Sequence, residues 1–150
     1  MNNSDQSDNI CLILFYSKAC GVQSKLSFSK EFKHCNIISY DGKNYVATEF
    51  NSQGIITRVL NVSDNVVRFI DRLKMIEELT AIYSLYIPKR AEFTWKPFWS
   101  RSCNELVRYS GGIDLGFTFN PYHLFKKLRK YNGMKNYRID YEWRRDNERN

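Results

Sequence analysis

The hydrophobic and polar positions of the chain alternate in short runs, a pattern that predicts strands more often than helices. Apolar, aromatic and β-branched residues dominate five runs of strand length, which are residues 10–17, 32–40, 43–50, 55–62 and 79–87. After Ser63 the spacing becomes helical. Apolar residues recur there at intervals of four and three, at Val66, Ile70, Leu73 and Ile76. This mixture of strands and peripheral helices predicts an α+β fold.

Two further helices are indicated by the residues at their ends. Ser102 is a good N-cap, and Glu105 follows it at the spacing of a capping box, so Cys103 is predicted to be the first helical residue. This helix should stop at Gly111-Gly112. A later helix should begin at Asn120-Pro121, with proline at its first position. Residues 138–143 are compatible with a last short strand.

A hairpin is predicted around Asp41-Gly42, which is a strong signal for a two-residue turn of type I′. Such a turn would place His34 directly opposite Glu49 on the same face of the hairpin. A three-residue loop would instead move the register by one and place Phe50 opposite. The pairing of His34 with Glu49 therefore depends on the turn.

Cys103, His34 and Glu49 together form a candidate catalytic triad. A helix N-terminus favours a thiolate, which is the nucleophilic form of cysteine. His34 would serve as the base, Glu49 would orient the imidazole, and the backbone N–H of Cys103 would be a natural oxyanion donor. The alternatives are that Cys103 is a small core residue at the start of a helix and that His34 has a structural role.

Candidate substrate-binding residues flank this triad. Asn36 shares the hairpin face of His34, and Trp95 and Trp99 precede the Cys103 helix, where they could either wall a groove or cover the core. Cys35 points to the opposite hairpin face and is expected in the core. His123 is expected to be exposed, near the cap of its helix.

Length and composition fit one folded domain. The chain has 150 residues, of which 43% are hydrophobic and 15% aromatic, and a chain of this size can bury a sizeable core. Residues 1–9 are polar and expected to be disordered. We expect a folded domain over residues 10–131 and a basic tail over residues 132–150.

The net charge of +7 is concentrated near the C-terminus. Residues 126–150 contain nine Lys and Arg against four Asp and Glu. Such a segment can bind nucleic acid or an anionic surface, and its interleaved tyrosines could stack on bases. The chain contains no recognised DNA- or RNA-binding motif, and a solvated basic face explains the charge equally well.

The spacing of the cysteines and the length of the apolar runs argue against metal-binding, secreted and membrane-spanning proteins. Cysteines at positions 11, 20, 35 and 103 have no CxxC spacing, so we expect reduced thiols, no metal site and no cofactor. No apolar run is long enough for a membrane span, and the N-terminal segment lacks the positive charge of a signal peptide. We therefore expect a cytoplasmic protein, with association with a virion as a further location.

Several segments together resemble a group of small phage and prophage proteins. The segments are Phe32-Lys33-His34-Cys35 with the hairpin to Glu49, Trp95-Lys96-Pro97-Phe98, Cys103-Asn104-Glu105-Leu106-Val107-Arg108, Gly112-Ile113, and Asn120-Pro121-Tyr122-His123-Leu124-Phe125-Lys126-Lys127-Leu128. That group is similar to the circularly permuted NlpC/P60-like branch of the papain-like cysteine peptidase superfamily, in which the histidine strand precedes the cysteine helix. The resemblance covers residues 10–130.

The resemblance implies a permuted papain-like core, with an antiparallel sheet and packed helices. It places Cys103 at the nucleophile position, His34 at the base and Glu49 at the orienting position. It also implies hydrolysis or transfer of an acyl group at an amide, isopeptide or ester bond, with peptidoglycan peptides as one substrate class. The alternative is a non-catalytic phage assembly or morphogenesis protein that keeps the fold, binds phage structural proteins and uses a basic binding tail.

Overall fold

The computed structural model describes residues 10–18, 31–40, 42–51, 54–63, 65–92 and 102–148. The strands are β1 (Ile10–Tyr16), β2 (His34–Tyr40), β3 (Tyr45–Asn51), β4 (Gly54–Leu60), β5 (Leu79–Tyr86) and β6 (Arg138–Arg144). The helices are α2 (Val66–Leu73), α3 (Cys103–Gly111) and α4 (Pro121–Lys130), followed by a 3-10 turn at Arg145–Glu148. The expected α+β class is confirmed.

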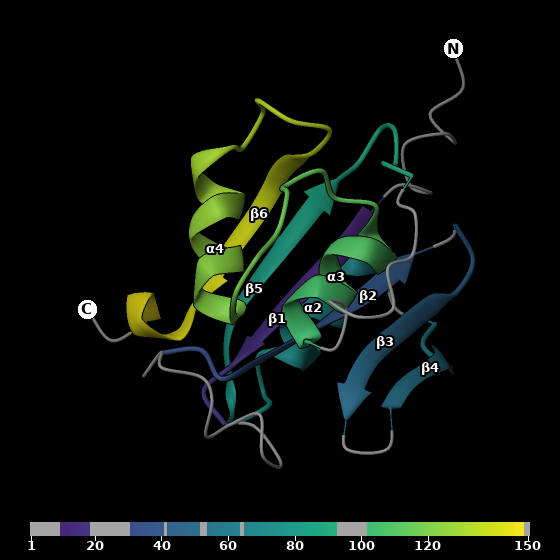
Figure 1. Cartoon of the computed structure of the whole chain (residues 1–150). Helices are drawn as coiled ribbons and strands as arrows, with labels where there is room; N and C mark the ends of the chain where they lie inside the picture. Colours follow the sequence, from purple (N-terminus) through teal and green to yellow (C-terminus); the bar gives the residue numbers. More distant parts are fainter. Residues whose placement is uncertain are drawn as a thin grey trace.

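The six strands form one antiparallel sheet in the order β4-β3-β2-β1-β5-β6 (Figure 1). The first four strands make a meander, and β5 then pairs with the far edge of β1. The central strand β1 is apolar at almost every position, because both of its faces are covered. Its residues Cys11 to Phe15 are at most 1% exposed.

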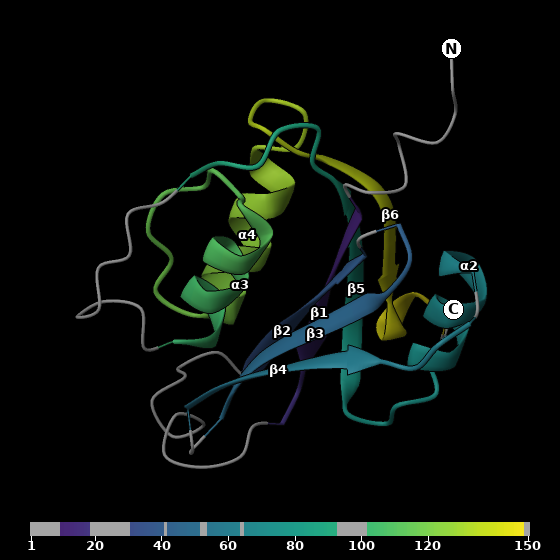
Figure 2. The same ribbon diagram turned by 90° about the vertical axis from the view of Figure 1, so that its right-hand side faces the viewer.

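Helices cover the sheet on both faces (Figure 2). On one face, α3 and α4 pack over a core that includes Phe15, Ile37, Tyr83 and Leu124. On the other face, α2 packs over a second core, whose members include Phe69. Alternate residues of β1 therefore contribute to opposite cores, as the two-residue period of a strand requires.

The β2–β3 hairpin differs in register from the sequence prediction. Tyr40 pairs with Tyr45, so four residues separate the two strands rather than two. The Tyr40 and Tyr45 rings are 4.8 Å apart, a cross-strand aromatic contact that favours this register. The predicted opposition of His34 and Glu49 is therefore wrong. The register differs from the predicted one by two residues, and a shift of two does not change the face of the hairpin to which alternation assigns each residue.

Strand β3 is paired with the second half of β2 only, not with its first residues. In the described chain, the last β2–β3 pair is Ile37 with Thr48, whereas β3 remains paired with β4 as far as Asn51. The start of β2 is still paired with β1 through Tyr16 and His34. The first three residues of β2 therefore have a strand neighbour on one side only, within the described residues.

The C-terminal segment is part of the domain rather than a separate tail. β6 pairs with β5 from Arg138 to Arg144, and the side chains of Tyr137 and Trp143 are 2% and 6% exposed. The predicted division at residue 131 is therefore wrong as far as residue 148, because apolar residues alternate with the charges and bury one face of β6. None of the helices in the described ranges combines the length and apolar character needed to cross a bilayer.

Candidate functional site

Helix α3 begins where the sequence predicts. Ser102 has extended backbone angles, and its hydroxyl accepts the backbone N–H of Glu105 at 3.4 Å, so Ser102 is the N-cap and Cys103 is the first helical residue. The helix ends at Gly112, whose φ of +62° favours glycine. Helix α3 packs on β2 and β3, and Cys103 belongs to the core beneath it.

Cys103 lies against the start of β2 and is 5% exposed. Two residues at the start of β2 influence its thiol most strongly, Cys35 through its side chain and backbone and His34 through its side chain. These contacts, together with the charge of His34, hold the pKa of the Cys103 thiol well below its usual value, although burial opposes them. The expected proximity of Cys103 and His34 is therefore present.

His34 can approach this sulfur because it is the first residue of β2. The neighbouring Cys35 contributes to the core under α3 and α4, so alternation alone would direct His34 to the other face. His34 is nevertheless among the groups that lower the pKa of the Cys103 thiol. The Tyr16 ring, across the β1–β2 pair, packs against the imidazole with centroids 5.8 Å apart.

Glu49 interacts with β4 rather than with His34. Its Oε1 accepts a hydrogen bond from Arg58 Nη2 at 2.7 Å, in a partly exposed ion pair. Burial raises the pKa of Tyr16 to about 12, and the charge of Glu49 adds to this effect. Glu49 therefore lies within electrostatic reach of Tyr16, but the structure does not place it as the orienting partner of the imidazole.

Asn36 contributes a polar group near the same end of β2. Its Nδ2 donates to Tyr16 Oη at 3.2 Å. Its Oδ1 is buried and has no hydrogen-bond partner in the part of the chain that the structure describes. An amide oxygen of this kind can accept a hydrogen bond from water or from a ligand. Trp95 and Trp99, the other predicted substrate-binding residues, lie outside the described residues, as does Cys20.

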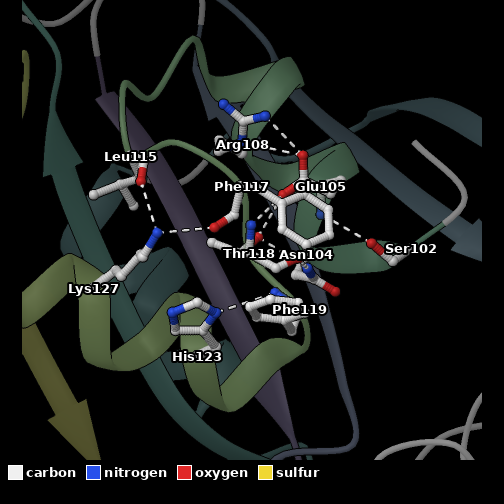
Figure 3. Close-up of polar contacts among 10 residues, drawn as sticks. All are labelled: Ser102, Asn104, Glu105, Arg108, Leu115, Phe117, Thr118, Phe119, His123 and Lys127. Carbon is white, nitrogen blue, oxygen red and sulfur yellow. Dashed lines mark hydrogen bonds and ion pairs between the residues drawn. The ribbon is translucent and has the colours of Figure 1, made fainter. Parts of the chain in front are cut away.

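A buried polar cluster next to Cys103 was not predicted (Figure 3). Glu105 Oε2 accepts from Arg108 Nη2 at 2.7 Å and Nε at 3.2 Å, while Oε1 accepts from the backbone N–H and hydroxyl of Thr118 at 2.8 and 2.7 Å. The Asn104 amide donates to the Thr118 carbonyl and hydroxyl at 2.5 and 2.9 Å. We define Asn104, Glu105, Arg108 and Thr118 as the α3 cluster; none of the four is more than 7% exposed.

The α3 cluster ties the start of the helix to the segment that leads into α4. Lys127 adds hydrogen bonds from Nζ to the Leu115 and Phe117 carbonyls, at 3.2 and 2.9 Å (Figure 3). The sequence predicts a capping role for Glu105, whereas its role in joining Arg108 to Thr118 becomes clear only from its burial and contacts. The sequence signal was a charged pair at the i, i+3 spacing in the helix that begins with Cys103.

His123 lies at the cap of α4, beside this segment. Its backbone N–H donates to Asn120 Oδ1 at 2.8 Å, and its Nδ1 accepts from the Phe119 N–H at 3.2 Å. Burial and the nearby lysines of α4 lower its pKa. The expectation that His123 lies near a helix cap is confirmed, but the residue is half-buried rather than exposed.

Comparison with family models, with curated proteins and with solved structures found no match. Within the described ranges, no three or more His, Cys, Asp or Glu side chains are grouped so that they could hold a metal ion. The candidate site consists of a thiol at a helix start, an imidazole, a second thiol and a supporting polar cluster.

Proposed function

We propose that the protein is a cysteine hydrolase or acyltransferase in which Cys103 is the nucleophile and His34 its proton-transfer partner. One observation carries the proposal. Cys103 is the first residue of α3, and Cys35 and the His34 imidazole lower the pKa of its thiol well below its usual value despite burial. A thiolate beside an imidazole is the arrangement that nucleophilic acyl transfer requires.

The chemistry proceeds in two steps. The Cys103 thiolate attacks the carbonyl carbon of an amide, isopeptide or ester, and the tetrahedral oxyanion accepts hydrogen bonds from N–H groups at the start of α3. Collapse breaks the bond to the leaving group, which takes a proton from His34, and leaves a thioester on Cys103. Water or an acceptor amine then attacks the thioester, gives its proton to His34 and releases the thiolate.

Tyr16 takes the place of Glu49 as the positioning residue for His34. Its ring packs against the imidazole, and Asn36 fixes its hydroxyl. The unpaired Asn36 Oδ1 is available to accept an N–H of a peptide substrate. The proposal thus keeps Asn36 as a substrate contact and assigns no catalytic role to Glu49.

The order of the elements supports a permuted papain-like core. The histidine begins a strand, and the cysteine begins a later helix that packs on that strand through Ile37 and Gly111. This order is the one implied by the resemblance to the permuted NlpC/P60-like branch. On this basis the substrates are peptide or acyl compounds, and peptide bonds of the cell wall are the first class to test.

The burial of Cys103 favours a second candidate function. A thiol that is 5% exposed is what a non-catalytic assembly protein with the same fold would also contain. In that case the contacts of Cys103 would serve to pack α3 on β2. Reactivity with an acyl donor separates the two functions, because packing alone produces no covalent intermediate.

The test is acylation by an activated ester, such as p-nitrophenyl acetate, followed by intact-protein and peptide mass spectrometry. We expect one acetyl group on Cys103, none in Cys103→Ala, and a rate about 10²–10⁴-fold lower in His34→Ala. Cys11→Ala is the matched control, because Cys11 is also buried but has no histidine among the causes of its pKa shift. Equal acylation of wild type and Cys103→Ala, or no acylation at all, would overturn the enzyme proposal.

A further inference from the structure

The two edges of the sheet differ in character. Strands β4 and β6 lie at the two ends of the strand order, so each has a strand neighbour on one side only within the described residues (Figure 1). β6 carries charged side chains at most of its positions, a composition that opposes pairing with another strand. β4 has the sequence GIITRVL, which is rich in β-branched residues and contains one charge. β4 is therefore the edge that is suited to pairing with a further strand.

The side chains of β4 leave two large apolar groups exposed on one face of the sheet. Ile55 and Val59 are 45% and 68% exposed, and alternation along the strand places them with Thr57 on the same face. The charged residue of β4, Arg58, belongs to the opposite face and is paired with Glu49 of β3 at 2.7 Å. The outer edge of β4 therefore presents apolar side chains, and its charge is already matched within the hairpin.

The register of the β3–β4 hairpin determines which backbone groups of β4 face outwards. The two strands close at Asn51 and Gly54, the register of a two-residue hairpin, in which the closing residues bond to each other through their backbones. In an antiparallel pair, every second residue directs its N–H and C=O groups to the neighbouring strand. Counted from Gly54, the backbone groups of Ile55, Thr57 and Val59 therefore point away from β3, towards the outer edge.

We propose that the outer edge of β4 is a homodimer interface, at which β4 pairs antiparallel with β4 of a second copy about a twofold axis at Thr57. In this register Thr57 faces its own equivalent, and Ile55 of each copy faces Val59 of the other. These are the residues whose backbone groups point outwards, so each facing pair exchanges both of its N–H···O hydrogen bonds. The sheets of the two copies then join into one continuous sheet.

A second copy fits this edge because the sequence of β4 is complementary to itself in the proposed register. The two exposed apolar residues lie at equal distances on either side of Thr57, so the twofold axis brings them together as apolar cross-strand pairs. On the other face, Arg58 lies across from Ile56 rather than from a like charge. Leu60 lies across from Gly54, where the space that a Cβ would occupy is open for the leucine side chain.

Sedimentation velocity of the full-length protein between about 1 μM and about 100 μM tests the proposal. We expect wild type to become dimeric across this range, and the Kd of Val59→Lys to be at least about 100-fold higher. The dimer contains this position twice, and burial of one valine side chain corresponds to about tenfold in affinity. Val67→Lys is the matched control, because Val67 is also 68% exposed but lies on α2, and this variant should dimerise like wild type.

Three outcomes would overturn the proposal. Wild type that stays monomeric at about 100 μM would show that the edge does not pair with a second copy. A Val59→Lys variant that dimerises like wild type would place the interface away from β4. Equal weakening by Val59→Lys and Val67→Lys would show that an added lysine, rather than its position on the edge, opposes association.

Amide hydrogen exchange of wild type, followed by NMR at both concentrations, examines the interface without any substitution. The amides of Ile55, Thr57 and Val59 should exchange more slowly in the dimer, whereas those of Ile56 and Arg58, which already face β3, should change much less. Equal exchange at both concentrations along the whole of β4 would contradict the proposal even if a variant failed to fold.

This inference goes beyond the proposed acyl-transfer function, because β4 supplies none of the residues assigned to that chemistry. Cys103→Ala should therefore dimerise like wild type. Acetylation of Cys103 in a protein that remains monomeric rejects the homodimer alone. A dimer that the ester never acylates rejects the acyl-transfer function and leaves the homodimer standing.

Discussion

Cys11 and Cys103 are buried in the same core, yet their pKa values are shifted in opposite directions. Each is at most 5% exposed, and both belong to the cluster between the sheet and the helices α3 and α4. Burial raises the pKa of Cys11, whereas the pKa of Cys103 falls well below its usual value. Burial by itself therefore does not decide whether a thiol in this protein is reactive.

The difference lies in what each sulfur contacts. Cys11 lies within β1, and its stabilising contacts with Arg90 and Ser39 are outweighed by the loss of water. Cys103 begins a helix, and Cys35 and His34 lower its pKa by more than the loss of water raises it. The lowered pKa thus belongs to the junction of a helix start with a strand start, and changes at that junction should affect one thiol and spare the other.

The largest effect should come from removing the carboxylate of the α3 cluster. Glu105→Ala removes the carboxylate that pairs with the buried Arg108 guanidinium and that accepts the Thr118 N–H. We expect this loss to lower the free energy of unfolding by about 3–5 kcal/mol. Urea unfolding measures this loss. The exposed Glu77 offers the control Glu77→Ala, which should be near neutral. Equal effects of the two variants would show that the α3 cluster does not hold the helix start.

The pH dependence of stability should have opposite signs for the two thiols. The Cys103 pKa is lowered on folding, so its contribution grows as pH rises towards about 8.5, the usual thiol pKa, and is lost as pH falls through the folded value. The Cys11 pKa is raised, so its contribution is present below about 8.5 and is lost as pH rises above that value.

Each unit of pKa difference corresponds to about 1.4 kcal/mol. Urea unfolding of wild type, Cys103→Ala and Cys11→Ala across this range measures both slopes. The stability advantage of wild type over Cys103→Ala should increase with pH below about 8.5, and that over Cys11→Ala should decrease above it. Parallel curves for all three proteins would mean that neither pKa changes on folding.

The smallest effect should come from the helix cap. Ser102→Ala removes the hydroxyl that accepts the Glu105 N–H and should cost about 1 kcal/mol of stability. It should also raise the pKa of Cys103, because the N–H groups of a frayed first turn no longer point towards the sulfur. The ultraviolet absorbance of the thiolate, titrated against pH, measures this shift, with Ser110→Ala in the same helix as control. An unchanged titration would assign the low pKa to His34 and Cys35 alone.

Local signals in the sequence predicted the ends of the elements well. Ser102 and Gly112 limit α3, and Asn120-Pro121 begins α4, because caps depend on residues close together in the chain. The strands β1, β5 and β6 also lie within a residue or two of the predicted runs. The α2 cap was placed two residues early, at Ser63 rather than Asn65, since both residues can cap a helix.

Contacts between distant segments were predicted less well. The Asp41-Gly42 signal favoured a short turn, but the contact of Tyr40 with Tyr45 selects a longer one, and the His34–Glu49 pair was lost with it. Cys35 was correctly placed in the core, yet its contact with Cys103 depends on where α3 crosses β2. The Glu105–Thr118 hydrogen bonds, which hold α3 against the segment before α4, also join residues that no local pattern relates.

The position of β1 in the middle of the sheet has a consequence for how the chain folds. The meander β1–β4 can form from neighbouring segments, but the second edge of β1 must wait for β5, because Phe15 pairs with Ala81. Pairings of such long range slow folding, and until β5 arrives the most apolar strand of the protein presents open backbone groups. We expect refolding yields to fall with increasing protein concentration, as chains compete with β5 for this edge.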